Sequence, residues 1–175
     1  MVNDIVSHLE MTSPHQLRAT ATGSLTLRQV STRDTDKIKT MHDRVASPHG
    51  WMSLAWSPER WREFLARPGV TTWLPSVDGD EPVGFVAVQA QAGGEVEIEF
   101  FGLVPEFTGR GLGGSLLTAV TEAAWRLPTL GDTPKVRRVW LRTSSHDHQN
   151  ALRCYQNAGY ELFHVEERER ELITP

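Results

Sequence analysis

The stretch EVEIEFFGLVPEFTGRGLGGSLLTAVTEAAWRL, residues 95–127, predicts a strand, a glycine-rich turn and a helix in succession. Its first part alternates apolar with mostly acidic residues, as in a strand with one buried face: Val96, Ile98 and Phe100 against Glu97, Glu99 and Phe101. We expect this strand to end at Val104, because Pro105 cannot donate a ladder hydrogen bond. After the turn, apolar residues recur at helical spacing: Leu112, Leu116, Leu117, Val120, Ala124 and Leu127.

Four glycines crowd the turn between this strand and this helix, at positions 109, 111, 113 and 114. A glycine backbone can turn sharply and approach a ligand closely. A helix N-terminus behind such a turn presents unpaired N–H groups and the positive end of the helix dipole, and Arg110 adds a positive charge. We therefore predict a phosphate or pyrophosphate site at this turn.

The composition is that of an ordinary soluble domain and argues against several classes of function. The chain has 175 residues, 39% hydrophobic and 23% charged, which is enough for one domain with a core. A net charge of −4 gives no polycationic field and argues against nucleic-acid binding. No apolar run is long enough to cross a membrane, and no basic region precedes an apolar core at the N-terminus, so we expect a cytoplasmic protein. The single cysteine, Cys154, rules out an internal disulfide.

The rest of the chain alternates between strands and helices. Strands are expected at residues 24–29, 70–77, 83–89, 136–143 and 160–165, with a break at Pro75, and helices at 32–45, 58–66 and 144–158. The first strands are joined by short turns and should be antiparallel, whereas the long helix after residue 111 makes a parallel crossover. The expected fold class is α/β (α+β), with a mixed, mostly antiparallel sheet and one parallel crossover at the anion site.

The two ends of the chain carry weaker signals. Residues 1–23 combine a weakly amphipathic start with a polar segment that contains Pro14, so we expect a loosely attached arm before a single domain over residues 24–175. The charge run at residues 166–171 is typical of a solvated edge. An exposed sheet edge could support a homodimer, which the sequence does not decide.

These features resemble the GCN5-related N-acetyltransferase (GNAT) superfamily, whose members transfer an acyl group from acetyl-CoA to an amine. The family's pyrophosphate signature is Gln or Arg, two residues, Gly, one residue, then Gly or Ala; the corresponding window here runs from Thr108 to Gly113. A second landmark, Ala, three residues, Tyr, three residues, Gly and an aromatic residue, is matched by Ala151, Tyr155, Gly159 and Tyr160. The resemblance covers residues 25–165 and implies the GNAT fold with acetyl-CoA as acyl donor.

The resemblance also implies how this cofactor would be held. Its pantetheine arm would pair with backbone groups of Leu103 and Val104, and His148 and Ala151 would lie near it. Its pyrophosphate would meet the turn and the helix start: Thr108, Gly109, Arg110, Gly111, Leu112, Gly113 and Gly114. Two positions depart from the family pattern. Thr108 replaces the usual Gln or Arg, which leaves the backbone amides as donors, and His148 stands where many members have Asn.

Acyl transfer to an amine needs a deprotonated amine, a polarised thioester carbonyl and a protonated leaving thiolate. The resemblance puts Glu97 at the strand position of a carboxylate base, and Glu99 shares its face about 6–7 Å along the strand. Either carboxylate could act through water, and two close carboxylates would raise one pKa. The alternative is that both are solvated residues on an exposed sheet face.

The resemblance gives the general-acid role to Tyr155, which could instead be a core tyrosine. His146 and His148 are further candidates for the base; with Asp147 between them they suggest a metal, but the sequence has no third and fourth ligand at a useful spacing, so no metal is expected. The amine would enter on the side opposite the cofactor, beneath a lid formed by the first two helices. There Trp51, Trp56 and His49 would line the site.

Two other functions stay open on the sequence alone. Gly109, Gly111 and Gly114 also match G-x-G-x-x-G, so an NADP-binding oxidoreductase is one alternative, although Arg142 and Thr143 stand where that pattern requires an acidic residue. A non-catalytic acyl-CoA-binding regulatory module is the other. The expected function is an acetyl-CoA-dependent N-acetyltransferase that acts by direct transfer on the primary amine of a small molecule or peptide.

Overall fold

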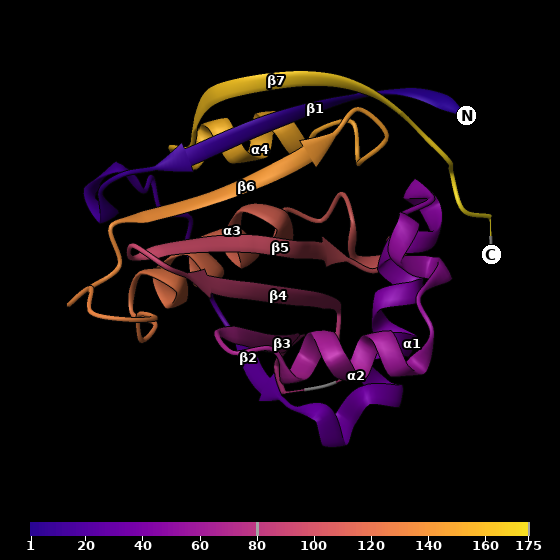
Figure 1. Cartoon of the computed structure of the whole chain (residues 1–175), viewed down its shortest axis with the longest axis horizontal. Helices are drawn as coiled ribbons and strands as arrows, with labels where there is room; N and C mark the ends of the chain where they lie inside the picture. The colour runs from indigo at the N-terminus through magenta and orange to yellow at the C-terminus, as the bar shows by residue number, and fades with distance from the viewer. Residues whose placement is uncertain (80, 175) are drawn as a thin grey trace.

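The computed structural model describes residues 1–79 and 81–174, which form a seven-stranded sheet in the order β2-β3-β4-β5-β6-β1-β7 (Figure 1). The strands are Val2–Met11 (β1), Leu25–Val30 (β2), Val70–Val77 (β3), Gly84–Gln91 (β4), Glu95–Leu103 (β5), Arg138–Ser144 (β6) and Glu161–Arg170 (β7). Within the described residues, β5 and β6 are the parallel pair and the other neighbours are antiparallel. The predicted mixed sheet with one parallel crossover is therefore confirmed.

Helices cover both faces of this sheet. They are Thr35–Ala46 (α1), Pro58–Ala66 (α2), Leu112–Trp125 (α3) and Ala151–Asn157 (α4), and a 3₁₀ turn, Met52–Ala55 (η4), lies between α1 and α2. On β4, Val86 and Val88 pack in the cluster that contains α3 and α4, whereas Phe85 and Ala87 pack in the cluster that contains α1 and α2. The two helix pairs therefore lie on opposite faces, with α3 and α4 behind the sheet in Figure 1. Over residues 1–79 and 81–174, no helix is both long enough and apolar enough to span a bilayer.

Two local sequence signals set where helices α2 and α3 begin. Helix α2 begins as predicted after Ser57, whose hydroxyl accepts a hydrogen bond from the Arg60 amide at 3.2 Å. Helix α3 begins after Gly111, which has a left-handed φ of 77°.

The predicted break of β3 at Pro75 is wrong. The ladder between β3 and β4 ends at Trp73, so the missing N–H of Pro75 costs no bond in that ladder.

The prediction of a loosely attached arm over residues 1–23 is also wrong. Residues 2–11 form β1, which lies between β6 and β7 and pairs with both. Leu9 and Met11 are fully buried, and after β1 the Ala21 carbonyl accepts a hydrogen bond from Ser115 on α3. The pattern of β1 is weak because Asp4 is fully buried where an alternating strand would carry an apolar residue.

The charge run at residues 166–171 is only partly the solvated edge that the sequence predicts. Most of it lies in β7, which extends to Arg170 and pairs with β1 as the edge strand of the sheet. Glu167 and Glu169 are exposed, but Arg170 is buried and lies beside Asp4. Within this run, Arg170 is therefore the residue that departs from a solvated edge.

His42 occupies the centre of the cluster between α1, α2 and the sheet. Its side chain is fully buried, and its ring centroid lies 4.5 Å from that of Trp61. Nε2 lies 2.7 Å from the Ser53 hydroxyl and Nδ1 lies 2.9 Å from an Asp43 carboxylate oxygen. Burial lowers the pKa of His42 to about 4, against the opposite influence of Asp43. The imidazole is therefore neutral at physiological pH and ties α1 to η4.

We expect His42 to reduce the free energy of unfolding by up to about 3 kcal/mol as the pH falls from 6.5 to about 4. Above this window the imidazole is neutral in both states. Within it, the unfolded chain binds a proton that the folded chain does not accept, so the unfolded state gains stability. Urea denaturation at a series of pH values measures the effect.

The variant His42→Gln keeps a polar partner for Ser53 and should lose this part of the pH dependence. His15→Gln changes an exposed histidine and should follow the wild type. Equal pH slopes for His42→Gln and the wild type would contradict the assignment.

Candidate active site

The site lies where β5 and β6 separate. Their parallel ladder ends at the pair Ile98 and Leu141, although both strands continue beyond it. On the other side of β5, a register shift against β4 leaves Glu99 as an extra residue between Ile98 and Phe100. A bulge of this kind bends a strand. The two strands therefore diverge from Glu99 onward, and two cavities open into the gap.

The smaller cavity has a volume of about 280 Å³ and lies between β5, the glycine turn and α4. Seven of the residues predicted to hold the cofactor line it: Leu103, Thr108, Gly109, Gly111, Gly113, His148 and Ala151. The other four lie outside its lining: Val104, Arg110, Leu112 and Gly114. The amide of Val104 already donates to the Val83 carbonyl, and Gly114 faces Thr20.

Two glycines shape the wall of this cavity at the start of α3. Gly109 and Gly111 have φ angles of 73° and 77°, which residues other than glycine rarely adopt. No atom lies within 4 Å of the place where a Cβ on either residue would stand. No side chain among the described residues caps the helix at Gly111. The open glycine backbone and the uncapped amides of α3 therefore fit a pyrophosphate group.

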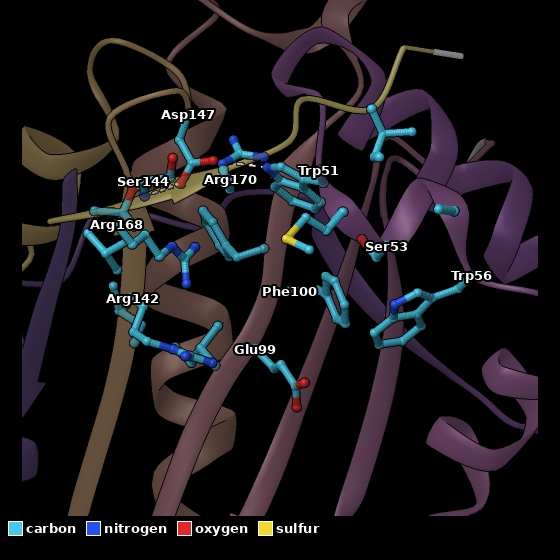
Figure 2. A pocket seen from close by; sticks show the side chains of 18 of the residues that line it. Trp51, Ser53, Trp56, Glu99, Phe100, Arg142, Ser144, Asp147, Arg168 and Arg170 are labelled. Atoms are coloured by element: carbon cyan, nitrogen blue, oxygen red, sulfur yellow. Dashed lines mark hydrogen bonds between the residues drawn. The ribbon is translucent and has the colours of Figure 1, made fainter. Parts of the chain in front are cut away.

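The larger cavity has a volume of about 550 Å³ and lies on the other side of the gap. Figure 2 shows Trp51 and Trp56 on one side of it and Arg142 and Arg168 on the opposite side, with Glu99 between them. Two of the three residues predicted to line the acceptor side, Trp51 and Trp56, are therefore in this cavity. The third, His49, lines the smaller cavity instead.

Four residues line both cavities: Trp51, Phe101, Asp147 and Tyr155. Helix α4 carries Tyr155 to this junction, where its ring packs edge-on against Phe101 at 6.0 Å. Burial raises the pKa of Tyr155 well above its usual value, and the charge of Asp147 acts in the same direction. The phenol at the junction is therefore protonated at any physiological pH.

The Asp147 carboxylate holds the turn after β6 against the opposite wall. One oxygen accepts a hydrogen bond from Trp51 Nε1 at 2.9 Å, and the other accepts from the Thr143 hydroxyl and the Ser144 amide, both at 2.8 Å. Asp147 is therefore committed to these donors. Of the two neighbouring histidines, His146 bonds to the Asn3 carbonyl and neither lines the larger cavity.

The two candidate carboxylates of β5 have different surroundings. Glu97 is 6% exposed and accepts hydrogen bonds from Gln91 at 3.1 Å and from Arg142 at 2.9 Å. Glu99 lines the larger cavity, and Glu97 does not. Burial raises the pKa of Glu99, and the negative charge of Glu97 raises it further against the influence of Arg67 and Arg142. The geometry thus separates a committed carboxylate from one that faces the cavity.

An ionic group centred on the buried Asp4 completes the larger cavity, and sequence reasoning missed it. Asp4 accepts hydrogen bonds from Ser144 and from Arg168 Nε at 3.0 Å, and Arg170 Nε lies 3.1 Å from the same carboxylate. Burial acts to raise the pKa of Asp4, but these donors and charges outweigh it and hold the pKa below its usual value. Arg170 also donates to the carbonyls of His49 and Gly50.

The one sequence signal for this ionic group is the spacing of its two arginines, which does not identify their partner. Arg168 and Arg170 are spaced to lie on one face of a strand, but their counter-ion is near the other end of the chain. Their pairing with Asp4 depends on the register between β1 and β7, which no local pattern specifies.

The model of the acetyltransferase (GNAT) family matches residues 38–160, which include the β5–α3 unit and most of the lining of both cavities. The chain belongs to the GNAT family. Domains of this family generally take an acyl group from acetyl-CoA or another acyl-CoA and transfer it. No curated protein matches the sequence.

Solved structures share the GNAT fold at low sequence identity. A conserved protein of unknown function from Staphylococcus epidermidis has a TM-score of 0.65 and 16% identity over 95% of this chain and 60% of its own. A GCN5-related N-acetyltransferase from Sphaerobacter thermophilus has a TM-score of 0.69 and 22% identity over 99% of this chain and 54% of its own. This chain thus spans little more than half the length of these two proteins. For YycN from Bacillus subtilis the TM-score is 0.61, with 20% identity over 85% of this chain and 99% of its own.

Proposed function

We propose that this GNAT protein is an acetyl-CoA-dependent N-acetyltransferase that moves the acetyl group directly to a primary amine of a small molecule or peptide. The observation that carries the proposal is the meeting of two cavities at Tyr155, one beside the glycine turn of α3 and the other beside Glu99. Direct transfer requires such a junction, because donor and acceptor must bind at once from opposite sides.

The smaller cavity is the proposed binding site for acetyl-CoA, which when bound supplies the activated acyl group as a thioester. The amides at the start of α3, with Gly109 and Gly111, would hold its pyrophosphate. Beyond Ile98, β5 has no ladder with β6, so its backbone groups that face the gap are available to the pantetheine arm. Thr108 stands where the family usually has Gln or Arg, so the pyrophosphate would be held mainly by backbone amides.

Glu99 is the proposed base on the acceptor side. The raised pKa of Glu99 lies closer to the pKa of an ammonium group. Proton transfer from the ammonium group to the carboxylate, directly or through water, is therefore less unfavourable. Glu97 is held by hydrogen bonds from Arg142 and Gln91, and its negative charge is part of what raises the pKa of Glu99. We therefore assign Glu97 a positioning role.

Tyr155 is the proposed general acid. Its hydroxyl lies at the junction of the cavities and is protonated because burial raises its pKa. Glu99 would first take one proton from the ammonium group. As the C–N bond forms and the C–S bond of the thioester breaks, Tyr155 would donate its proton to the sulfur, and the second proton lost by the amine nitrogen would return to the Tyr155 oxygen. The charge balance of the step is kept within the site.

The volume of the larger cavity limits the size of the amine but does not identify it. Its volume of about 550 Å³ accommodates a small molecule or the end of a peptide. The tryptophans offer apolar surface, and Arg142 and Arg168 offer hydrogen-bond donors on the opposite side (Figure 2). The NADP alternative loses its basis, because the glycines belong to a GNAT turn in a mixed sheet. An acyl-CoA-binding module without catalysis remains the second candidate.

We expect wild-type protein to bind acetyl-CoA in isothermal titration calorimetry and Gly111→Ala to weaken that binding at least tenfold. The new methyl group would stand in the open wall of the smaller cavity. Gly131→Ala is the matched control, because Gly131 has a φ of 75° and equally open surroundings but lies outside both cavities. An equal loss in both variants would attribute the effect to backbone strain, and absence of binding by the wild type would exclude the proposed function.

We expect Glu99→Gln to lower kcat for CoA release with a responsive amine roughly 100-fold or more at pH 7, with little change in acetyl-CoA affinity. Glu97→Gln should cost less and move the acidic limb of kcat/KM to lower pH, because removing its charge lowers the pKa of Glu99. Full activity of Glu99→Gln would exclude it as the base. Acetyl-CoA binding without CoA release over a broad amine panel would favour the non-catalytic module.

We expect Tyr155→Phe to lower kcat at least tenfold, since no proton donor remains at the junction. Its melting temperature should change little, because the buried ring is kept. Tyr160→Phe is the control: its hydroxyl lies 2.6 Å from that of Thr121 in the core, so its loss should lower the melting temperature by about 2–4 °C and leave kcat unchanged. Equal kcat in Tyr155→Phe and wild type would remove the general-acid role.

A further inference from the structure

A cluster of two histidines and a glutamate bridges β1 and β7, which lie side by side at the edge of the sheet (Figure 1). His8 on β1 stands directly opposite His164 on β7, and their ring centroids are 5.0 Å apart. Glu166 is two residues further along β7 and so projects from the same face. One nitrogen or oxygen atom from each side chain lies within 4.8 Å of the other two.

A buried nitrogen atom of His8 is the observation that indicates a ligand. Its Nε2 atom is buried and has no hydrogen-bond partner among the residues that the structure describes. This atom lies 3.5 Å from Glu166 Oε1 without forming a hydrogen bond. Buried polar atoms without a partner are rare, and an ion is one of the standard reasons for them.

Aromatic neighbours hold the His8 ring in this orientation. It stacks on Trp140 with an interplanar angle of 6° and meets the edge of Phe163. Trp140 is itself held by a hydrogen bond from its Nε1 to Gln91 at 3.0 Å. The ligand atom is therefore positioned before any ion binds, which lowers the entropy that binding would cost.

The donor set and its spacing suit one class of ion. Two imidazoles and a carboxylate form the three-ligand set of open zinc sites, and imidazole also suits Cu, Ni and Fe. A tetrahedral ion with bonds of about 2.0–2.1 Å holds its ligand atoms about 3.4 Å apart. The separation of 3.5 Å between His8 Nε2 and Glu166 Oε1 meets this value. His164 is exposed, so its ring can rotate to close the remaining distance.

We propose that His8, His164 and Glu166 form a binding site for a divalent transition-metal ion of the Zn²⁺ class, with at least one further position for water. None of the three residues lines either cavity, so the site is separate from the proposed acetyl-transfer chemistry. The ion would join the edge strand β7 to β1. Beyond Glu166, the same strand carries Arg168 and Arg170, so the ion would also stabilise a wall of the larger cavity.

Metal titration of untagged, chelator-treated protein tests this site. Calorimetry with Zn²⁺ should give one ion per chain, and Zn²⁺ at a hundredfold excess over its Kd should raise the melting temperature by roughly 5–10 °C. Co²⁺ should give the visible absorption bands of a low-coordinate nitrogen and oxygen site. Mg²⁺, which prefers oxygen ligands, should produce no rise at the same concentration.

Variants locate the bound ion. His164→Ala and Glu166→Gln should each weaken Zn²⁺ binding at least tenfold, and the nearly isosteric Glu166→Gln keeps the test informative if His164→Ala folds poorly. His15→Ala removes another exposed histidine and should bind as the wild type does. Absence of Zn²⁺ binding, an equal response to Mg²⁺, or unchanged binding in both cluster variants would overturn the proposal. None of these outcomes depends on acetyltransferase activity.

Discussion

The separation of β5 from β6 beyond Ile98 and Leu141 is the constraint on which the rest of the site depends. Two parallel strands that stay paired leave no room between them, whereas here the ladder ends and the bulge at Glu99 turns β5 away. Both cavities open into the resulting gap. Helices α3 and α4 then bring the glycine turn and Tyr155 to one side. The connection between α1 and α2 supplies the aromatic wall on the other side, and β6 and β7 supply the arginines.

A gap inside a sheet removes ladder hydrogen bonds, so other contacts have to hold its two halves together. The Asp147 carboxylate, at the end of β6, accepts a hydrogen bond from Trp51, which belongs to the connection between α1 and α2. Arg170, on β7, donates to the carbonyls of His49 and Gly50 in the same connection. The buried charge of Arg170 is balanced by Asp4. These contacts bridge the gap at its mouth, and the two chain ends thereby contribute to the site.

Much of the smaller cavity, the proposed cofactor site, could be predicted from the sequence, because its determinants are local. Glycines at positive φ, an uncapped helix start and an alternating strand are each visible within a few residues. The larger cavity, the proposed acceptor site, could not be predicted in the same detail. Glu97 and Glu99 are two residues apart in one strand, and nothing in their immediate sequence distinguishes them. Their difference arises from Arg142 and Gln91 on other strands and from a bulge that only the pairing with β4 reveals.

By itself, the sequence determined the strand, glycine turn and helix at residues 95–127, the mixed sheet and the GNAT resemblance, because periodicity and glycine placement act over short stretches of chain. Only the tertiary structure decided that the first strand belongs inside the sheet, that Glu99 rather than Glu97 faces the cavity, and that Arg168 is bound to Asp4. The physical reason is sequence separation. The Arg142–Glu97 pair spans 45 residues and the Arg168–Asp4 pair spans 164, so each requires a strand register that no local pattern encodes.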